Sequence, residues 1–312
     1  MDHVPVLLAE TLHFLNTDAF AEQSGVFVDA TFGGGGHSAA ILESAAAVQL
    51  LAIDRDETAA GRAAALTARF GSRFRFMRGN FAELPHLLAA AGLPLVDAIL
   101  FDLGLSSYQL GELERGFSFR LDGPLDMRMD QSLTTTAAAI VNHAEPAELK
   151  RLLREYGEEP RAAKIARAIV ARRAEKPFAT TRELADLVVG LTPPAARNRR
   201  LHPATRVFQA LRIAVNAELE ALRRVLPAAL ASLRSGGRLV VIAYHSLEDR
   251  IVKKTFHEWA APCICPPGLP VCACGRTPQV EILTRRPVVP GAAEVRTNPR
   301  SRSAKLRAVV KR

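Results

Sequence analysis

Two acidic residues and the glycine run between them are the part of this 312-residue chain whose spacing most clearly indicates chemistry. An apolar segment, Phe27–Ala30, contains Asp29 and leads into Gly33–Gly36, and Asp54 follows about 18 residues after the last of these glycines. Glycine lets the backbone approach a ligand closely because no Cβ stands in the way. An acid at the tip of the next strand can accept hydrogen bonds from both ribose hydroxyls of a nucleoside. The pattern therefore predicts a site for a nucleoside cofactor.

The charge of this segment indicates which nucleoside binds. A dinucleotide site places a pyrophosphate at a helix N-terminus, where the helix dipole favours an anion. Here Gly33–Gly36 is followed by His37 without the third glycine of the dinucleotide pattern, and the Asp29 carboxylate would repel a pyrophosphate. S-adenosyl-L-methionine carries an ammonium and a sulfonium and has no phosphate. We therefore expect S-adenosyl-L-methionine as the cofactor rather than a dinucleotide.

The elements that position these residues alternate between strand and helix patterns, which predicts an α/β fold with a parallel sheet. The expected strands are 26–30, 50–54, 74–78, 96–102 and 237–244. Two closing strands are expected at 280–284 and 304–310.

The stretch between the fourth and fifth strands is about ninety residues longer than a crossover connection needs. Most of it has the pattern of helices, so we predict an inserted helical domain at 111–205. The sheet domain then consists of 1–110 and 206–312. A single long helix over 205–233 is expected to lead back to the sheet.

Ligands of open parallel sheets bind beyond the carboxyl ends of the strands. Four expected strand ends carry polar side chains there: Asp29, Asp54, Asp102 and Tyr244–Ser246. An aromatic residue, Phe81, follows the third strand, where its ring could cover an adenine face or could instead anchor the next helix in the core. The sequence leaves these two roles of Phe81 open.

The amino-acid composition indicates the size of the core and the cellular location of the protein. Hydrophobic residues make up 48% of the chain, enough for a large core and two domains. No segment has the pattern of a membrane span or an export signal, and all four cysteines lie between Cys263 and Cys274. A disulfide framework is therefore not expected, and we predict a cytoplasmic protein without a membrane partner.

The net charge of +9 favours a polyanionic partner. Two segments concentrate that charge: Arg197–Arg212 has five arginines and no acid, and Arg296–Arg312 has seven Lys or Arg and no acid. They could form one face on a nucleic acid, or they could be a solvated helix face and a solvated tail.

The four cysteines form two pairs with a single intervening residue, Cys263 with Cys265 and Cys272 with Cys274. Four thiolates could close a tetrahedral zinc site, but structural zinc sites usually have two to four residues between paired ligands. Thiols without a metal in a surface loop are therefore the preferred interpretation, and we assign no metal ligand.

Strings of residues along nearly the whole chain resemble one family, the bacterial ribosomal small-subunit RNA cytosine-N4 methyltransferases of the MraW type. The matching strings are His3–Leu8, Asp29–Gly33, Gly35–Ser38, Ala52–Asp56, Asp102–Ser107, Arg115–Phe119, Asp122–Met129, His202–Gln209, Tyr244–Arg250 and Asn298–Ser303.

The resemblance implies a Rossmann-like, S-adenosylmethionine-dependent methyltransferase sheet with an inserted all-helical substrate domain. It also implies a cytidine in the decoding region of 16S ribosomal RNA as the substrate. The sequence leaves open whether the partner is the free RNA or the small ribosomal subunit, and whether the protein is a monomer or a dimer. The cofactor contacts that the resemblance implies are Gly35, Gly36, His37, Asp54, Phe81, Asp102 and Gln109.

The chemistry of cytosine agrees with a nitrogen target. Methylation of a ring carbon requires a cysteine nucleophile, and no cysteine adjoins the fourth strand end. An exocyclic amine needs only acceptors for its protons and a methyl group held in near-attack geometry. Our hypothesis is that Asp102 orients the donor or the amine and that His245 takes the proton or positions the base. His245 could instead be a helix-entry residue that binds the backbone.

Two alternative hypotheses place the protein in other functional classes. A catalytically idle RNA-binding assembly factor would use the same basic face, and it would differ from an enzyme in leaving the methyl donor unconsumed. A methyltransferase acting on DNA or on a protein amine would differ in its substrate.

Overall fold

The computed structural model describes residues 5–120, 122–193, 202–263, 265 and 274–312. The chain divides into two compact units. The first consists of Met1–Gly104 together with Glu220–Arg312, and the second of Leu105–Leu219.

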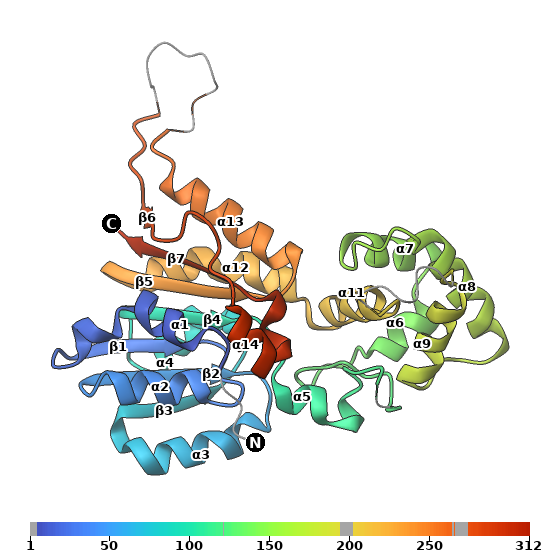
Figure 1. The fold of residues 1–312 in the computed structure, drawn as a ribbon, viewed down its shortest axis with the longest axis horizontal. Helices are drawn as coiled ribbons and strands as arrows, with labels where there is room; N and C mark the ends of the chain where they lie inside the picture. Colours follow the sequence, from blue (N-terminus) through green and yellow to red (C-terminus); the bar gives the residue numbers. More distant parts are fainter. Residues whose placement is uncertain (1–4, 121, 194–201, 264, 266–273) are drawn as a thin grey trace. The chain divides into compact units, whose positions relative to one another are not determined.

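The first unit is built on a sheet that has seven strands within the described residues, in the order β3-β2-β1-β4-β5-β7-β6 (Figure 1). The first five strands in sequence pair in parallel, and β7 runs antiparallel to β5 and β6. The sequential order of the strands reverses between β1 and β4, so the carboxyl ends of these two strands are the expected ligand site. The strands are β1 (Gly25–Asp29), β2 (Val48–Asp54), β3 (Phe74–Arg78), β4 (Val96–Asp102), β5 (Leu233–Ala243), β6 (Val280–Ile282) and β7 (Lys305–Lys311).

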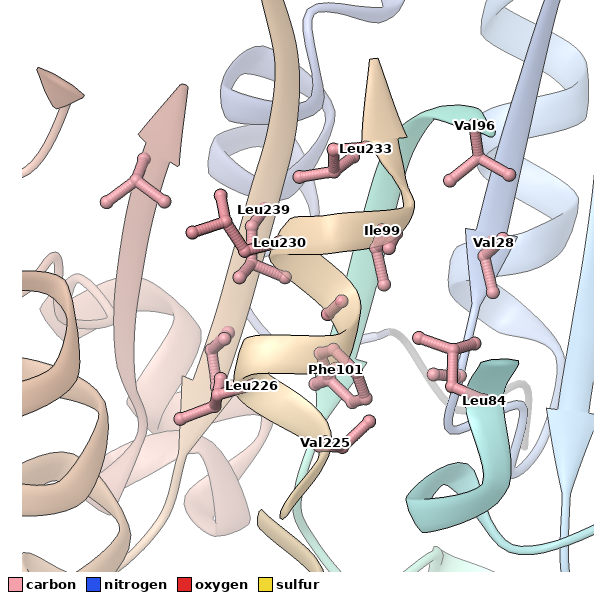
Figure 2. Packing of buried hydrophobic residues seen from close by; sticks show 14 of the residues in the cluster. Val28, Leu84, Val96, Ile99, Phe101, Val225, Leu226, Leu230, Leu233 and Leu239 are labelled. Atoms are coloured by element: carbon pink, nitrogen blue, oxygen red, sulfur yellow. The ribbon is translucent and has the colours of Figure 1, made fainter. Parts of the chain in front are cut away.

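Two layers of helices bury the two faces of this sheet. Alternate residues of each strand point to opposite faces, so Ile99 and Phe101 enter one core while Ala98 and Leu100 enter the other. Figure 2 shows side chains of α12 facing those of β4 in the first core, among them Val225 and Phe101. The first core is covered by α4 (Leu84–Ala90), α12 (Glu218–Ser232) and α13 (Ser246–Ala260), and the second by α1 (Leu8–Leu15), α2 (Gly36–Ser44) and α3 (Ala59–Phe70).

The second unit is helical and has a separate hydrophobic core. Its helices are α5 (Ser107–Gly111), α6 (Ala137–His143), α7 (Pro146–Glu155), α8 (Ala162–Glu175), α9 (Thr181–Gly190) and α11 (Thr205–Asn216). The predicted insertion, 111–205, lies within this unit, which extends beyond it at both ends.

The predicted α/β class and all seven predicted strands are confirmed, with strand bounds that differ by a few residues. The prediction of one continuous helix over 205–233 was wrong. Ala217 has a left-handed backbone (φ 48°) and separates α11 from α12. The side chain of Asn216 donates to the carbonyl of Met127, 2.8 Å away, and so fixes the end of α11 inside the second unit. Hydrophobic periodicity continued through this break because both helices are buried on one side.

Two of the strings that carry the family resemblance, Arg115–Phe119 and Asp122–Met129, help to build the second unit. The buried guanidinium of Arg115 donates to the carbonyls of Arg128 and Met129, and the Met129 N–H donates to Asn216. A Cβ on Gly116 would lie 2.1 Å from the carbonyl oxygen of Pro124, so only glycine fits there.

Within the described residues, no helix has the length and apolar character needed to cross a membrane.

Candidate functional site

The glycine bend joins the end of β1 to the start of α2. Gly33 and Gly35 have positive φ angles of 53° and 79°, and Gly35 caps α2 while its N–H donates to the carbonyl of Phe32. A Cβ on Gly35 would lie 2.8 Å from the Phe32 ring, and one on Gly36 would lie 2.5 Å from Cγ of Pro5. The bend therefore tolerates only glycine at these two positions, because of the φ angle at Gly35 and close neighbours at both.

Replacing Gly35 by alanine should cost more than replacing a glycine that has the same backbone but open surroundings. Gly92 is the matched control, since its φ is 71° and a Cβ there would meet nothing within 4 Å. We expect Gly92→Ala to lower the free energy of unfolding by about 1 kcal/mol. Gly35→Ala should lower it by about 1–3 kcal/mol more through overpacking against Phe32. Urea denaturation measures both, and equal losses would show that the contact with Phe32 is unimportant.

Asp54 ends β2 beside the bend. Its Oδ2 accepts the Gly33 N–H at 2.7 Å, and its Oδ1 accepts the Asp56 N–H at 2.9 Å. Burial raises the pKa of Asp54, and these two backbone donors partly offset that rise. A carboxylate offers about four acceptor positions, so one on each oxygen remains for the two hydroxyls of a ribose. The bend and this carboxylate thus fit S-adenosyl-L-methionine.

Asp29 has a different role from the one that the charge argument gave it. Its side chain is buried, with Oδ2 accepting the Ser38 hydroxyl at 2.7 Å and Oδ1 accepting the Thr31 N–H at 3.2 Å. Burial raises its pKa, against the lowering effect of the Ser38 hydroxyl. Asp29 therefore ties α2 to the end of β1 beneath the bend, and it does not present its carboxylate at the surface.

Asp102 ends β4, the neighbour of β1 in the sheet. Its backbone N–H donates to the Thr31 hydroxyl at 2.6 Å, and its Oδ2 lies 3.6 Å from Nδ1 of His37. The other ring nitrogen of His37, Nε2, lies 3.1 Å from the Val6 carbonyl. The Asp102 side chain is 22% exposed, whereas that of His37 is 7% exposed. Asp102 is thus held at a strand end with part of its carboxylate open to a ligand.

Tyr244, the residue after β5, interacts with the same carboxylate. Burial raises the pKa of Tyr244 well above its usual value, and the negative charge of Asp102 adds to the rise, so the hydroxyl stays protonated. A Cβ on Gly104 would lie 2.6 Å from the Tyr244 ring, so glycine at 104 lets the ring pack close to the backbone after β4.

A comparison with models of known protein families identifies the family of this chain. The model of the MraW methylase family matches residues 1–312. The chain belongs to the MraW methylase family. Membership confirms the predicted Rossmann-like methyltransferase class and S-adenosyl-L-methionine as the methyl donor.

Individual relatives extend this comparison. The chain is 56% identical over 307 residues to the "Ribosomal RNA small subunit methyltransferase H" of Thermomicrobium roseum, covering 98% of this chain and 92% of the relative. It is 51% identical over 310 residues to the protein of the same name from Symbiobacterium thermophilum, covering 99% and 96%. Among solved structures, an rRNA methylase from Streptococcus thermophilus superimposes with a TM-score of 0.43 at 12% identity, covering 100% of this chain and 98% of that chain.

His245 of this methylase is the N-cap of α13. Its Nδ1 accepts the Glu248 N–H at 3.4 Å, and its Nε2 lies 3.2 Å from Oε1 of Glu248. The buried Glu248 carboxylate in turn accepts the Tyr244 N–H at 2.9 Å and the His245 N–H at 3.3 Å, completing a capping box. These contacts support the helix-entry role that the sequence analysis left open for His245.

Phe81 begins the short helix η3 (Phe81–Glu83) directly after β3. Its ring meets Phe101 edge to face, with centroids 5.6 Å apart, and it packs on the first core while half-buried. Asn80 fixes this turn, because its side chain accepts the Ala82 N–H at 2.9 Å. The anchoring role is thus visible in the structure, and a role of the exposed part of Phe81 at an adenine is a proposal.

Gln109 belongs to the second unit, whereas the other predicted cofactor contacts belong to the first. It is buried in α5, where its side chain accepts the Ser106 N–H at 3.1 Å and its own N–H donates to the Ser106 hydroxyl at 3.1 Å. The two residues form a capping box that fixes the start of α5. Gln109 as a cofactor contact stays a prediction.

Two cations of the basic segment Arg296–Arg312 form ion pairs within the methylase. Arg307 is buried and, with Lys305, pairs to Asp249 at 2.6 Å and 3.1 Å. The exposed cations of that segment include three arginines in or next to α14 (Ala292–Thr297) and the short helix η5 (Pro299–Ser303): Arg296, Arg300 and Arg302. The other basic segment, Arg197–Arg212, begins outside the described residues.

Two residues of the site were not assigned a role from the sequence. Thr31, after β1, accepts the backbone N–H of Asp102, and Tyr244, after β5, interacts with its carboxylate; neither belongs to a recognisable catalytic pattern. One signal was present in the sequence, because Gly104 comes just after the predicted fourth strand and Tyr244 ends the predicted fifth, and these two strands are neighbours in the sheet.

Proposed function

We propose that the protein transfers the methyl group of S-adenosyl-L-methionine to the exocyclic N4 amine of a specific cytidine in the decoding region of 16S ribosomal RNA. The observation that supports it most is the position of Asp102 next to the glycine bend: its carboxylate is part exposed at the end of β4 and interacts with Tyr244, and its backbone N–H donates to the Thr31 hydroxyl. The names of the two relatives support RNA of the small subunit as the substrate.

In the proposed reaction, the bound cofactor supplies an electrophilic methyl group on a sulfonium. The amine nitrogen would form a bond to that carbon as the carbon–sulfur bond breaks, S-adenosylhomocysteine would leave, and the nitrogen would release its proton to solvent. Asp102 accepts a hydrogen bond from the amine, which frees its lone pair from the ring and aims it at the methyl carbon. The protonated Tyr244 hydroxyl is proposed to donate to the same carboxylate and so to fix its orientation.

The position of the cysteines supports nitrogen rather than carbon 5 as the target. A carbon-5 enzyme attacks the ring with a cysteine thiolate. All four cysteines of this chain lie between Cys263 and Cys274, in the connection from α13 to β6, and none follows β4.

The second unit is proposed to hold the RNA, with the inserted domain 111–205 as its recognition element. Several of its cations are engaged internally: Arg151 pairs with Glu148 and Glu155, and Arg173 donates to the carbonyls of Val141 and Ala144. Exposed cations remain for phosphates on its α7 and α8 helices, among them Lys150, Arg154 and Arg167.

His245 is proposed to act through its cap, as a residue that positions Tyr244, and replacements can separate this from proton transfer. Asparagine is a good N-cap that cannot act as an imidazole base. We expect His245→Asn to keep the single-turnover methyl-transfer rate within about threefold, while His245→Ala loses about 1 kcal/mol of stability through the lost cap. If both replacements abolish transfer although the protein stays folded, the imidazole takes the proton.

Cells that lack the protein provide the test of the proposed function. Mass mapping of their small-subunit RNA should show one cytidine that has lost a methyl group, restored by the wild-type gene and not by an Asp102→Asn copy. An assembly factor without catalysis would instead be complemented by the Asp102→Asn copy. An unchanged RNA methylation map would move the substrate to DNA or to a protein amine.

A further inference from the structure

Three cysteines between α13 and β6 lie close together in space although the sequence separates them. The Sγ atoms of Cys263, Cys265 and Cys274 all lie within 4.8 Å of one another, and those of Cys263 and Cys274 are 3.8 Å apart. Cys272, the fourth cysteine of the sequence pattern, lies outside the described residues. The paired spacing alone argued against a metal, but it did not show that the chain returns Cys274 to Cys263.

We propose that Cys263, Cys265 and Cys274 bind a zinc ion that closes the connection between α13 and β6. In tetrahedral coordination with Zn–S bonds of about 2.3 Å, two sulfur ligands stand about 3.8 Å apart. The distance between Cys263 and Cys274 equals this tetrahedral edge. A disulfide would bring the two sulfurs to about 2.05 Å. Three sulfur donors favour zinc over the hard cations magnesium and calcium.

A backbone contact supports the thiolate form of Cys263. The N–H of Cys265 lies 3.3 Å from Sγ of Cys263 and donates to it. Hydrogen bonds of this kind stabilise the charge of a metal-bound thiolate and orient the ligand. Zinc binding releases the thiol protons to solvent and involves no change of oxidation state.

The surrounding chain offers a frame for such a clip. The Gln279 N–H donates to the carbonyl of Trp259 at 2.8 Å, and the Arg312 N–H donates to the carbonyl of Gln279 at 3.0 Å. These bonds join the end of α13 to the start of β6 and to the end of β7. The segments that leave α13 and return to β6 run side by side (Figure 1). Zinc at the three cysteines would fasten the connection beyond this base.

Metal analysis of the full-length protein, purified without chelator, tests the proposal. We expect about one zinc per chain in the wild type and less than about a tenth of an equivalent in Cys263→Ala. Thr277→Ala is the matched control, because Thr277 is exposed in the same connection and offers no sulfur, and it should keep the full zinc content. Wild-type protein with less than about a tenth of an equivalent, or with iron or copper in place of zinc, would overturn the proposal.

Cobalt substitution gives a second readout that does not depend on a variant. Wild-type protein loaded with Co²⁺ should show a sulfur-to-cobalt charge-transfer band together with the intense visible absorption of tetrahedral cobalt. Zinc should displace it at one equivalent. A spectrum of octahedral cobalt without a sulfur band would exclude coordination by these cysteines, whatever the stability of Cys263→Ala.

Discussion

The Asp102→Asn protein should bind cofactor but transfer methyl groups about 100- to 1,000-fold more slowly than the wild type under single-turnover conditions. Asparagine keeps the size of the side chain, but it is a weaker acceptor for the amine protons and can turn a donor towards the amine. The measurement uses saturating S-adenosyl-L-methionine and small-subunit RNA, so a change in cofactor affinity does not enter the rate. Calorimetry with S-adenosylhomocysteine measures that affinity separately.

Tyr244→Phe is the control for this prediction. It removes the hydroxyl that binds Asp102 and keeps the ring that packs beside Gly104. We expect a loss of about 10-fold in rate, because the carboxylate is still present but less well oriented. An Asp102→Asn protein with the wild-type rate and weakened S-adenosylhomocysteine binding would make Asp102 a cofactor contact alone.

Asp54→Asn should weaken S-adenosylhomocysteine binding on the order of 100-fold. The replacement removes the charge and turns one of two acceptor oxygens into a donor, so at most one ribose hydroxyl can keep its partner. The same oxygen atoms accept the N–H groups of Gly33 and Asp56, so the glycine bend should also loosen. Isothermal titration calorimetry measures the affinity, and denaturant unfolding measures the stability.

Asp97 supplies the matched control, because its side chain, like that of Asp54, accepts a backbone N–H from another segment of the chain. Its Oδ2 accepts the Val26 N–H at 2.8 Å, at the start of β4, the amino-terminal edge of the sheet. Asp97→Asn should therefore cost stability without changing cofactor affinity. Equal losses of affinity in the two variants would mean that Asp54 acts only through the stability of the sheet.

The positions of the strand-end residues followed from the sequence because topology alone fixes them. Parallel strands bring their carboxyl ends to one edge, so Asp54 and Asp102 were placed by the strand pattern before any contact was known. The orientation of a side chain beyond the last strand residue is a different matter. Asp29 turns under the bend to meet Ser38, and periodicity contains no information on that rotation.

Contacts between distant segments were the part that the sequence did not reveal. Tyr244 reaches Asp102 only because β5 lies next to β4, and Cys274 reaches Cys263 only because the chain folds back between α13 and β6. His245 illustrates a third limit. Its place after a strand is the same for a proton acceptor and for a helix cap, and the 3.4 Å contact with Glu248 is the observation that favours the cap.

Transfer of an isotopically labelled methyl group tests the central claim most directly. Purified protein is incubated with S-adenosyl-L-methionine carrying a deuterated methyl group and with small-subunit RNA or particles, and the digested nucleosides are separated by mass spectrometry. The Asp102-centred site predicts a single labelled nucleoside that co-elutes with N4-methylcytidine and disappears with Asp102→Asn. Label on carbon 5 of cytidine, or an unlabelled RNA despite bound cofactor, would contradict it.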